Sequence, residues 1–335
     1  MQPETAKPRR TPWGLIIGLV IVVALGLLVR ASWHEVEQAL ELLRGAQPLW
    51  IVGAVLAIAA GFLSAGQVYG RVLATLGHRE PPLWLAAAAM VTILINQAVP
   101  AGSVAAYAFL VTSLRKRQLP VASVAMVAGL ELLSWNGAVI IAFTYGVIYL
   151  LLTSGFNGAT INIGALGGAC ILLGSVIFLA TRTDATLHRW VGGLSAFAKR
   201  RLNQAIDLQG VERVLDEVLH SRQVMIEQPR QVGVMVLLQL TVFIFHSMAL
   251  LSILHALHIA PTPFAAMAAY GLALIVSVFT VLPGGGGTVE AALTAALVAM
   301  GVPAAAALGA AVVFRLLNFW VLLPLGAFAY RALTR

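Results

Sequence analysis

Long apolar segments alternate with short polar ones along most of the 335-residue chain. A helix needs about 20 apolar residues to cross a hydrocarbon core of about 30 Å. Six segments meet this length, and we predict that each forms a membrane-spanning helix. Their approximate bounds are Trp13–Val29, Leu49–Val68, Val121–Leu152, Ile161–Thr181, Val232–Leu254 and Ala304–Tyr330. The expected fold class is therefore an all-α, polytopic helical membrane protein.

Two further apolar stretches are interrupted by proline and glycine. Leu83 to Leu114 breaks at Asn-Gln-Ala-Val-Pro-Ala-Gly, and Phe264 to Met300 breaks at Leu-Pro-Gly-Gly-Gly-Gly. Proline removes a backbone donor, and a run of glycines does not hold a helix. Irregular backbone survives at membrane depth only inside protein or beside a wet cavity. Each stretch is therefore expected to form a helical hairpin or a pair of tightly joined short helices.

The order of these elements repeats along the chain. Residues 49–152 contain a span, a broken hairpin and a span, and residues 232–330 contain the same three elements in the opposite orientation. Inverted repeats are typical of transporters whose sites lie where broken helices meet. No residue-by-residue repeat is visible, so two coincidentally kinked regions remain the alternative. We treat 1–335 as a single membrane domain in which 182–230 forms a basic, amphipathic cytoplasmic connector.

Composition and charge agree with this class. Hydrophobic residues make up 60% of the chain and charged residues only 10%, against about 25% charged residues in soluble domains. The net charge is +8, but the basic residues cluster at the ends of apolar segments, as in cytoplasmic loops. They form no aromatic-interleaved stripe of the kind that binds nucleic acid. We therefore expect the inner (cytoplasmic) membrane, both termini in the cytoplasm, and no nucleic-acid partner.

Three charged residues lie in apolar surroundings, where a charge costs at least about 2.5–3.5 kcal/mol. Glu131 is ten residues into one predicted span, Arg315 is eleven residues into the last, and Glu290 follows the glycine run by three positions. An intramembrane charge is by default a candidate site for substrate. The alternative is a structural ion pair between Glu290 and Arg315 that fixes the second hairpin against the last span.

The two breaks supply further candidates. The proline and glycines of the second break present successive backbone N–H groups at a helix start, which suits an anion such as a phosphate. Close helix packing is the alternative, and the absence of a following Lys-Ser/Thr excludes a nucleotide loop. Polar residues around the first break are expected to line the same cavity. The candidate substrate-binding residues are Glu131, Glu290, Arg315, Asn96, Pro100, Pro283, Gly284, Gly285, Gly286 and Gly287.

The remaining polar residues of the spans favour packing. His246 has no neighbouring cysteine or second histidine, so we expect a hydrogen-bonded histidine, and Asn136 and Asn318 are interpreted as packing residues. His255 and His258 have no nearby carboxylate to complete a metal site. We expect no catalytic residue, no metal, no cofactor, and hence a protein that is not an enzyme.

These motifs resemble the lysylphosphatidylglycerol synthase transmembrane-region family, also called flippase-like proteins. The most specific match is Leu-Pro-Gly-Gly-Gly-Gly-Thr-Val-Glu-Ala-Ala-Leu over 282–293, followed by Val-Phe-Arg-Leu-Leu-Asn-Phe-Trp over 313–320. An earlier match is the first break, over 96–102. Many relatives carry an acidic residue and an arginine just after that break, where residues 103–109 of this chain are uncharged.

The resemblance implies a lipid translocase, a flippase or scramblase, that moves a phospholipid or polyprenyl-linked lipid across the cytoplasmic membrane. Complete synthases add a cytoplasmic aminoacyl-transfer domain, so the expectation here is the translocating half alone. The expected partners are membrane lipids with an anionic, aminoacylated or polyprenyl-linked headgroup, and a homo-oligomer or a partner enzyme is compatible with the sequence. The alternative is a non-transporting membrane subunit that scaffolds an envelope-lipid or glycosylation enzyme. An integral-membrane transferase comes third.

Overall fold

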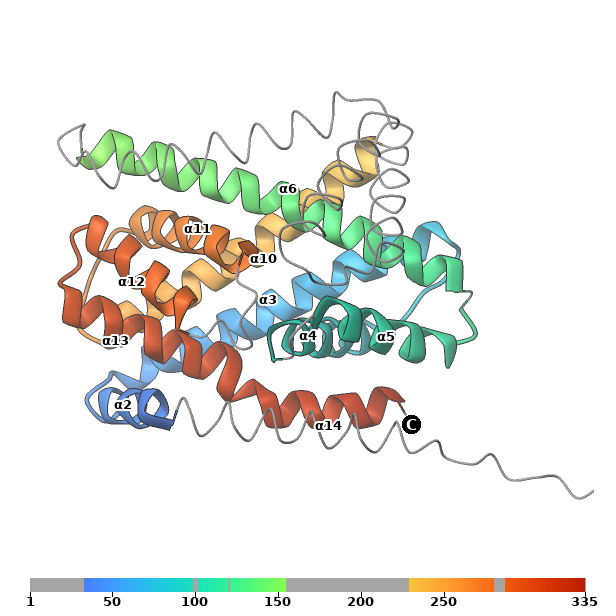
Figure 1. Cartoon of the computed structure of the whole chain (residues 1–335), viewed down its shortest axis with the longest axis horizontal. Helices are drawn as coiled ribbons and strands as arrows, with labels where there is room; N and C mark the ends of the chain where they lie inside the picture. Colours follow the sequence, from blue (N-terminus) through green and yellow to red (C-terminus); the bar gives the residue numbers. More distant parts are fainter. Residues whose placement is uncertain (1–32, 99–101, 120, 155–228, 280–286, 335) are drawn as a thin grey trace, which may run out of the picture.

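The computed structural model describes residues 33–98, 102–119, 121–154, 229–279 and 287–334. Within these ranges every regular element is helical, as predicted (Figure 1). The elements are α2 (Trp33–Arg44), α3 (Pro48–Thr75), α4 (Pro82–Ala98), α5 (Gly102–Arg115), α6 (Val121–Ser154), α10 (Pro229–Ala256), α11 (Pro263–Phe279), α12 (Thr288–Ala299), α13 (Ala304–Arg315), the π-helical turn η3 (Leu316–Trp320) and α14 (Leu322–Thr334).

Four helical segments are long and apolar enough to cross a membrane. They are α3, most of α6, α10, and the continuous run of α13, η3 and α14. These four correspond to the spans predicted near residues 49–68, 121–152, 232–254 and 304–330. The predicted spans 13–29 and 161–181 lie outside the described residues, as does the predicted connector except for its last two residues, which begin α10.

Each interrupted apolar stretch forms two short helices. The first stretch gives α4 and α5, of 17 and 14 residues, and the second gives α11 and α12, of 17 and 12 residues. At 1.5 Å per residue these helices are about 18 to 26 Å long, less than the hydrocarbon thickness of about 30 Å. The two arms pack against each other in both cases. The connecting residues 99–101 and 280–286 lie outside the described residues.

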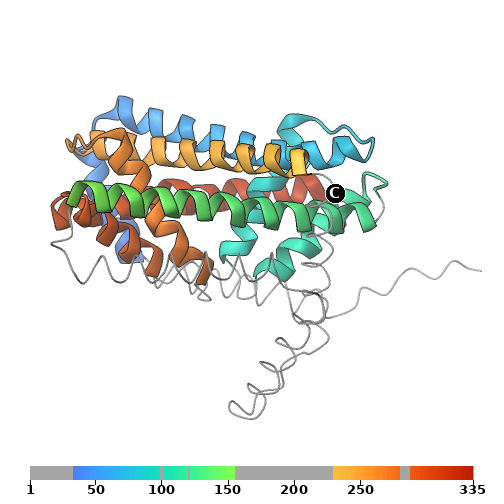
Figure 2. The same cartoon turned by 90° about the horizontal axis from the view of Figure 1, so that it is seen from above.

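The antiparallel helices α3 and α10 pack side by side and form one side of the bundle in Figure 2. The Gln47 amide at the start of α3 donates to the Ala256 carbonyl at the end of α10, 3.0 Å away. Farther along, Gly61 faces His246 so closely that a Cβ on the glycine would lie 2.7 Å from the imidazole ring. A small residue therefore allows the two spans to pack closely against each other.

The long span of each half packs against the first hairpin arm of the other half. α6 contacts α11, and α14 contacts α4. A Cβ on Gly271 of α11 would lie 2.3 Å from the Ala142 carbonyl oxygen of α6. In the second contact, a Cβ on Gly326 of α14 would lie 2.4 Å from the Leu94 side chain. A glycine thus lets each hairpin pack closely on the opposite half, against backbone at Gly271 and against the Leu94 side chain at Gly326.

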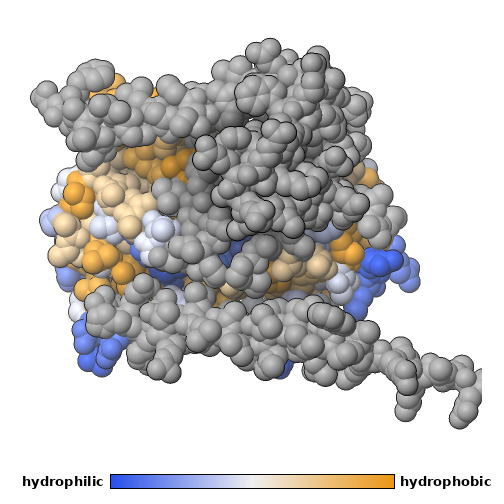
Figure 3. Space-filling view, in the orientation of Figure 1, coloured by the Kyte–Doolittle hydropathy of each residue, from blue (hydrophilic) through white to orange (hydrophobic). Residues whose placement is uncertain are grey.

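One end of the bundle carries a cluster of charged residues. At one end Arg117 pairs with Glu80 at 2.8 Å and lies over the Trp84 ring, and the Lys116 ammonium donates to the Thr334 carbonyl. The loops expected on the cytoplasmic side after α3, α5 and α14 therefore share one end. Figure 3 shows hydrophilic residues gathered near this end and around α2, with apolar residues over much of the visible described surface between them.

Candidate functional site

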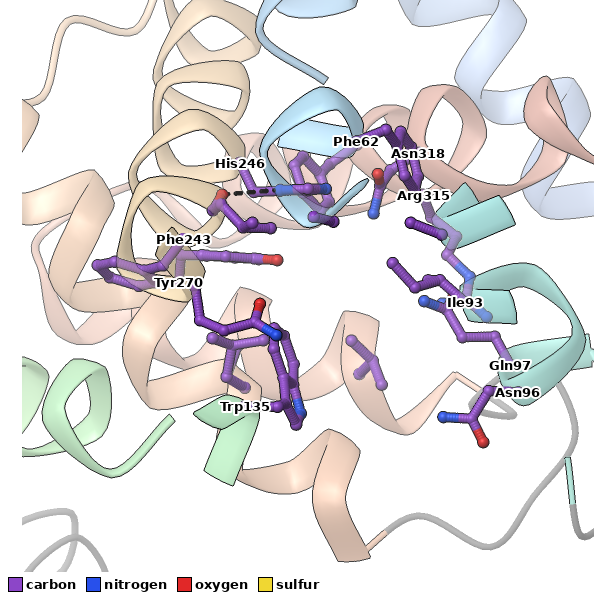
Figure 4. Close-up of a pocket in the computed structure, with 18 of the residues that line it drawn as sticks. Phe62, Ile93, Asn96, Gln97, Trp135, Phe243, His246, Tyr270, Arg315 and Asn318 are labelled. Atoms are coloured by element: carbon purple, nitrogen blue, oxygen red, sulfur yellow. Dashed lines mark hydrogen bonds between the residues drawn. The ribbon is translucent and has the colours of Figure 1, made fainter. Parts of the chain in front are cut away.

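A cavity of about 410 Å³ lies where the two hairpins meet α3, α6, α10 and α13 (Figure 4). Its wall includes residues from α3, α4, α6, α10, α11, α12, α13 and η3, so all four of the described spans and both hairpins contribute. Asn96 and Gln97 near the end of α4 and Val289 and Glu290 at the start of α12 line it, so the helix ends that flank the two breaks meet at the cavity. Its volume is within the roughly 300–1,000 Å³ of small-molecule sites.

A buried ion pair forms one wall. Arg315 Nε lies 3.0 Å from Glu290 Oε1, and the two side chains are only 12% and 8% exposed. Gly287 precedes α12 with φ +79°, a left-handed conformation that favours glycine, and Glu290 follows in the first helical turn. A carboxylate is stabilised there by the positive end of the helix dipole. The structural ion pair considered from the sequence is therefore present, and it lines the cavity.

The arginine is also held from its other side. Its guanidinium lies over the Phe319 ring, 4.4 Å from the ring centre, and Phe319 itself is fully buried. The π-helical turn η3 begins directly after Arg315, with the Val321 amide donating to the Leu316 carbonyl at 2.9 Å. Such turns are rare and are frequently found at functional sites. The aromatic contact and the ion pair together restrict the direction of the guanidinium.

Only one oxygen of the Glu290 carboxylate is paired in this arrangement. Glu290 Oε2 is buried and has no hydrogen-bond partner among the described residues. An unpaired acceptor costs more when it is shielded from water, and most buried polar groups have a partner. Glu290 Oε2 is therefore a buried acceptor at the site whose hydrogen-bonding capacity no described residue satisfies.

The second carboxylate lies on a different wall. Glu131 of α6 lines the cavity and lies close enough to the Tyr69 hydroxyl to interact electrostatically with it. Tyr69 shares a hydrogen bond with Thr92, whose own hydroxyl donates to the Ala88 carbonyl at 2.8 Å, so Tyr69 is the donor to Thr92. No basic side chain of the described ranges forms an ion pair with Glu131. The cavity therefore carries two carboxylates and one guanidinium.

Aromatic rings cover much of the cavity surface between these charges. The His246 ring lies nearly parallel to Tyr270, with 6.1 Å between ring centres, and meets the Phe62 ring edge-on. Tyr270 also stacks on Phe243 at 5.7 Å. Figure 4 shows Trp135 across the cavity from His246 and Phe62. These rings hold one another in place, so the cavity has preformed flat faces.

His246 has the hydrogen bond expected from the sequence. Its Nδ1 lies 2.9 Å from the Val242 carbonyl oxygen, and since a carbonyl only accepts, Nδ1 is the donor. In the neutral ring the other nitrogen, Nε2, is then an acceptor. The packing role predicted for this histidine is therefore correct but incomplete, because His246 also lines the cavity.

The sequence-predicted site residues fall into three groups. Glu131, Glu290, Arg315 and Asn96 all line the one cavity, although they come from four different helices. Gly287 lies at the start of α12, beside the cavity residue Val289. The other candidates lie outside the described residues, namely Pro100, Pro283, Gly284, Gly285 and Gly286.

Several lining residues were missed or assigned only to packing. Asn136 and Asn318, interpreted as packing residues, both line the cavity, and Asn136 in addition donates to the Leu132 carbonyl at 2.7 Å. Gln239, Trp135 and Tyr270 were not singled out from the sequence. One signal was available: Gln239, Val242, Phe243 and His246 recur at helical spacing, so two polar groups share one face of an apolar span.

These features define a class: a polytopic α-helical membrane protein with two short helical hairpins around a central, charged and aromatic cavity. The lysylphosphatidylglycerol synthase TM region family matches residues 15–326 of the chain. The chain therefore belongs to this family, which confirms the resemblance noted in the motifs. No curated protein matches the chain.

Proposed function

We propose that this protein is a lipid translocase, a flippase or scramblase, that moves a phospholipid or a polyprenyl-linked lipid between the leaflets of the cytoplasmic membrane. The observation that carries this proposal is the central cavity with its buried Glu290–Arg315 pair, enclosed by membrane-spanning helices. Buried charges in a membrane are costly and mark substrate pathways by default. Membership in a membrane-embedded, lipid-related family supports the same reading.

The arrangement of the hairpins supports an alternating exposure of this cavity. α4 and α5 join the rest of the chain at the basic end, near Glu80 and Arg117. The opposite hairpin joins α10 at the other end, where Tyr145 of α6 donates to the Phe264 carbonyl at 3.2 Å. We propose that the two units, 49–152 and 232–330, form an inverted repeat. Rocking of the units would then open the cavity to one leaflet at a time.

In this mechanism the charged wall receives the polar headgroup while the acyl or prenyl chains stay in the bilayer. Burying an ion pair is expensive because both ions lose hydration, and additional hydrogen bonds offset that cost. A headgroup that donates to Glu290 would supply such a bond at the unpaired Oε2. The sequence Gly284–Gly287, which precedes α12, is proposed to receive a lipid phosphate, as helix N-termini do.

We further propose that translocation proceeds without catalysis, metal or cofactor, and that the basic end faces the cytoplasm with both termini. The membrane lipids themselves are the proposed partners. A homo-oligomer or an associated enzyme is compatible with this mechanism.

The test is translocation in proteoliposomes with headgroup-labelled lipids, scored by how much label an external reagent reaches in each leaflet. We expect movement above empty liposomes, lost in Arg315→Ala and in Glu290→Gln. Glu80→Gln is the matched control, since this carboxylate pairs with Arg117 at the basic end of the bundle and does not line the cavity. Full activity of both cavity variants would refute the proposed site. No movement of any lipid, in folded protein, would favour the scaffold subunit instead.

A further inference from the structure

Most hydrogen-bonding side chains of the cavity are neutral and can both donate and accept. Five amide side chains line it, and an amide both donates and accepts. They come from four elements of the bundle, α4, α6, α10 and η3. The five residues are Asn96, Gln97, Asn136, Gln239 and Asn318. A ligand that matches this wall must itself both donate and accept at several positions.

The charges of the cavity further restrict which headgroup it can bind. Glu290 and Arg315 neutralise each other across 3.0 Å, which leaves Glu131 as the carboxylate without an ion-pair partner among the described residues. A phosphate in the cavity would face this carboxylate and could not donate to Glu290 Oε2. An ammonium group could donate to the carboxylates, but it could not accept from the amide N–H groups. Neither charged headgroup satisfies the whole wall.

Two buried oxygen atoms at the cavity are hydrogen-bond acceptors that need a donor. Glu290 Oε2 and Asn318 Oδ1 are both buried and lack hydrogen-bond partners among the described residues. A hydroxyl can donate to either oxygen and can accept from a neighbouring amide N–H. A small molecule with several hydroxyl groups could therefore form hydrogen bonds with all these groups at once.

The aromatic faces fit the other side of such a molecule. The Tyr270, Phe243 and Trp135 rings border the cavity, and aromatic faces carry partial negative charge that attracts the C–H groups of a ring or chain. In Figure 4, Tyr270 and Phe243 lie across the cavity from Asn96 and Gln97, and Trp135 lies between the two sides. Apolar and amide surfaces therefore face the same space. Flat apolar faces beside amide groups that both donate and accept suit a polyhydroxylated ring or chain.

We infer that the cavity binds a neutral, polyhydroxylated headgroup, a sugar or another polyol, of a membrane lipid. This inference rests on the proposed lipid translocation and names the class of its substrate. Any phosphate of such a lipid would lie outside the cavity, and the hydroxyls would bind between the amides and the Glu290–Arg315 wall. The shared chemistry is the polyol, which a glycolipid or a free sugar could supply.

The test is lipid selection by the full-length protein in nanodiscs. The bilayer contains equal amounts of glucosyl-diacylglycerol, phosphatidic acid and phosphatidylethanolamine with the same acyl chains. Lipids that stay with the purified protein are measured by mass spectrometry. We expect glucosyl-diacylglycerol to be enriched at least about fivefold over both others, the factor for one net hydrogen bond. Equal retention, or preference for phosphatidic acid or phosphatidylethanolamine, would overturn the inference.

Two cavity variants and one control locate the site. Gln239→Leu and Trp135→Leu are each expected to abolish the enrichment, while Gln67→Leu, an exposed glutamine on α3 that does not line the cavity, retains it. Size-exclusion profiles identify any variant that fails to fold, and Asn318→Leu then replaces it. Enrichment that survives in every folded cavity variant would overturn the inference.

Two further arms separate the outcomes. Excess free glucose that raises the thermal midpoint as much as the glycolipid would show a soluble polyol site, and would overturn the lipid source. Translocation is measured separately on the same protein. Glycolipid selection without movement would refute the proposed translocase and leave the polyol site standing. Movement of phosphatidic acid without glycolipid selection would support the translocase and refute the polyol site.

Discussion

The Arg315 guanidinium bridges α13 and α12 by pairing with Glu290, with 3.0 Å between Nε and Oε1. The two residues are 25 positions apart, and the pair joins the returning arm of the second hairpin to the last span. The same guanidinium lies over Phe319, one helical turn farther along. A substrate that competes for either contact would therefore act on the hairpin directly.

Breaking this pair from one side is expected to destabilise the fold. Glu290→Gln leaves a buried guanidinium without its carboxylate, and loss of one partner of a buried pair typically costs about 3–5 kcal/mol. The double variant Glu290→Gln with Arg315→Met is expected to lose clearly less than the sum of the two single changes. Unfolding in detergent, followed by circular dichroism, measures this double-mutant cycle. Additive losses would contradict a direct interaction.

The aromatic contact is expected to orient Arg315. Phe319→Leu keeps an apolar side chain at a fully buried position but removes the ring below the guanidinium. A buried cation–π contact is worth about 2 kcal/mol, and we expect translocation to fall while the ion pair persists. The matched control is Phe328→Leu, since Phe328 on α14 is 76% exposed and lies outside the cavity. Equal losses in both variants would exclude a specific role for Phe319.

The contact between α6 and α11 has no room for a methyl group. In Gly271→Ala the added Cβ would lie 2.3 Å from the Ala142 carbonyl oxygen, a backbone atom, so the helices must separate. We expect a loss of stability of about 1–3 kcal/mol, as for other overpacked cores. Thermal unfolding of the purified protein measures the change.

Gly233→Ala is the control for this prediction. Gly233 lies within α10, and an added Cβ would meet nothing within 4 Å among the described residues. Replacing a helical glycine by alanine there is expected to stabilise the protein by roughly 0.5–1 kcal/mol. A similar loss in both variants would show that the contact of α11 with α6 is not tight.

Single cysteines test the orientation of the bundle. Arg115→Cys lies at the basic end and Ala260→Cys in the turn after α10, and both positions are exposed. In a Cys170→Ser background, we expect an impermeant maleimide to label Ala260→Cys in intact spheroplasts and Arg115→Cys only after permeabilisation. The physical reason is the retention of basic loops on the cytoplasmic side. The reverse pattern would place the basic end outside.

Much of the architecture follows from the sequence because a bilayer acts on each segment locally. The hydrocarbon thickness sets the length of a span, and lipid offers no partner to a broken backbone. For that reason the apolar run that becomes α3 and the interrupted run that becomes α4 and α5 can be recognised without knowledge of their neighbours. The cost of a charge in lipid likewise marks Glu131, Glu290 and Arg315.

The character of the cavity was decided by tertiary structure alone. Gln239 and Trp135 look like ordinary residues of apolar spans until α10 and α6 meet around the same space. The pairing of Glu290 with Arg315, and the room that Gly271 leaves for the Ala142 carbonyl, depend on helix contacts between residues far apart in the chain. Local apolarity specifies that a helix lies in the membrane, but it carries no information on which neighbour each face meets. Only packing brings the amides, rings and charges together into one site.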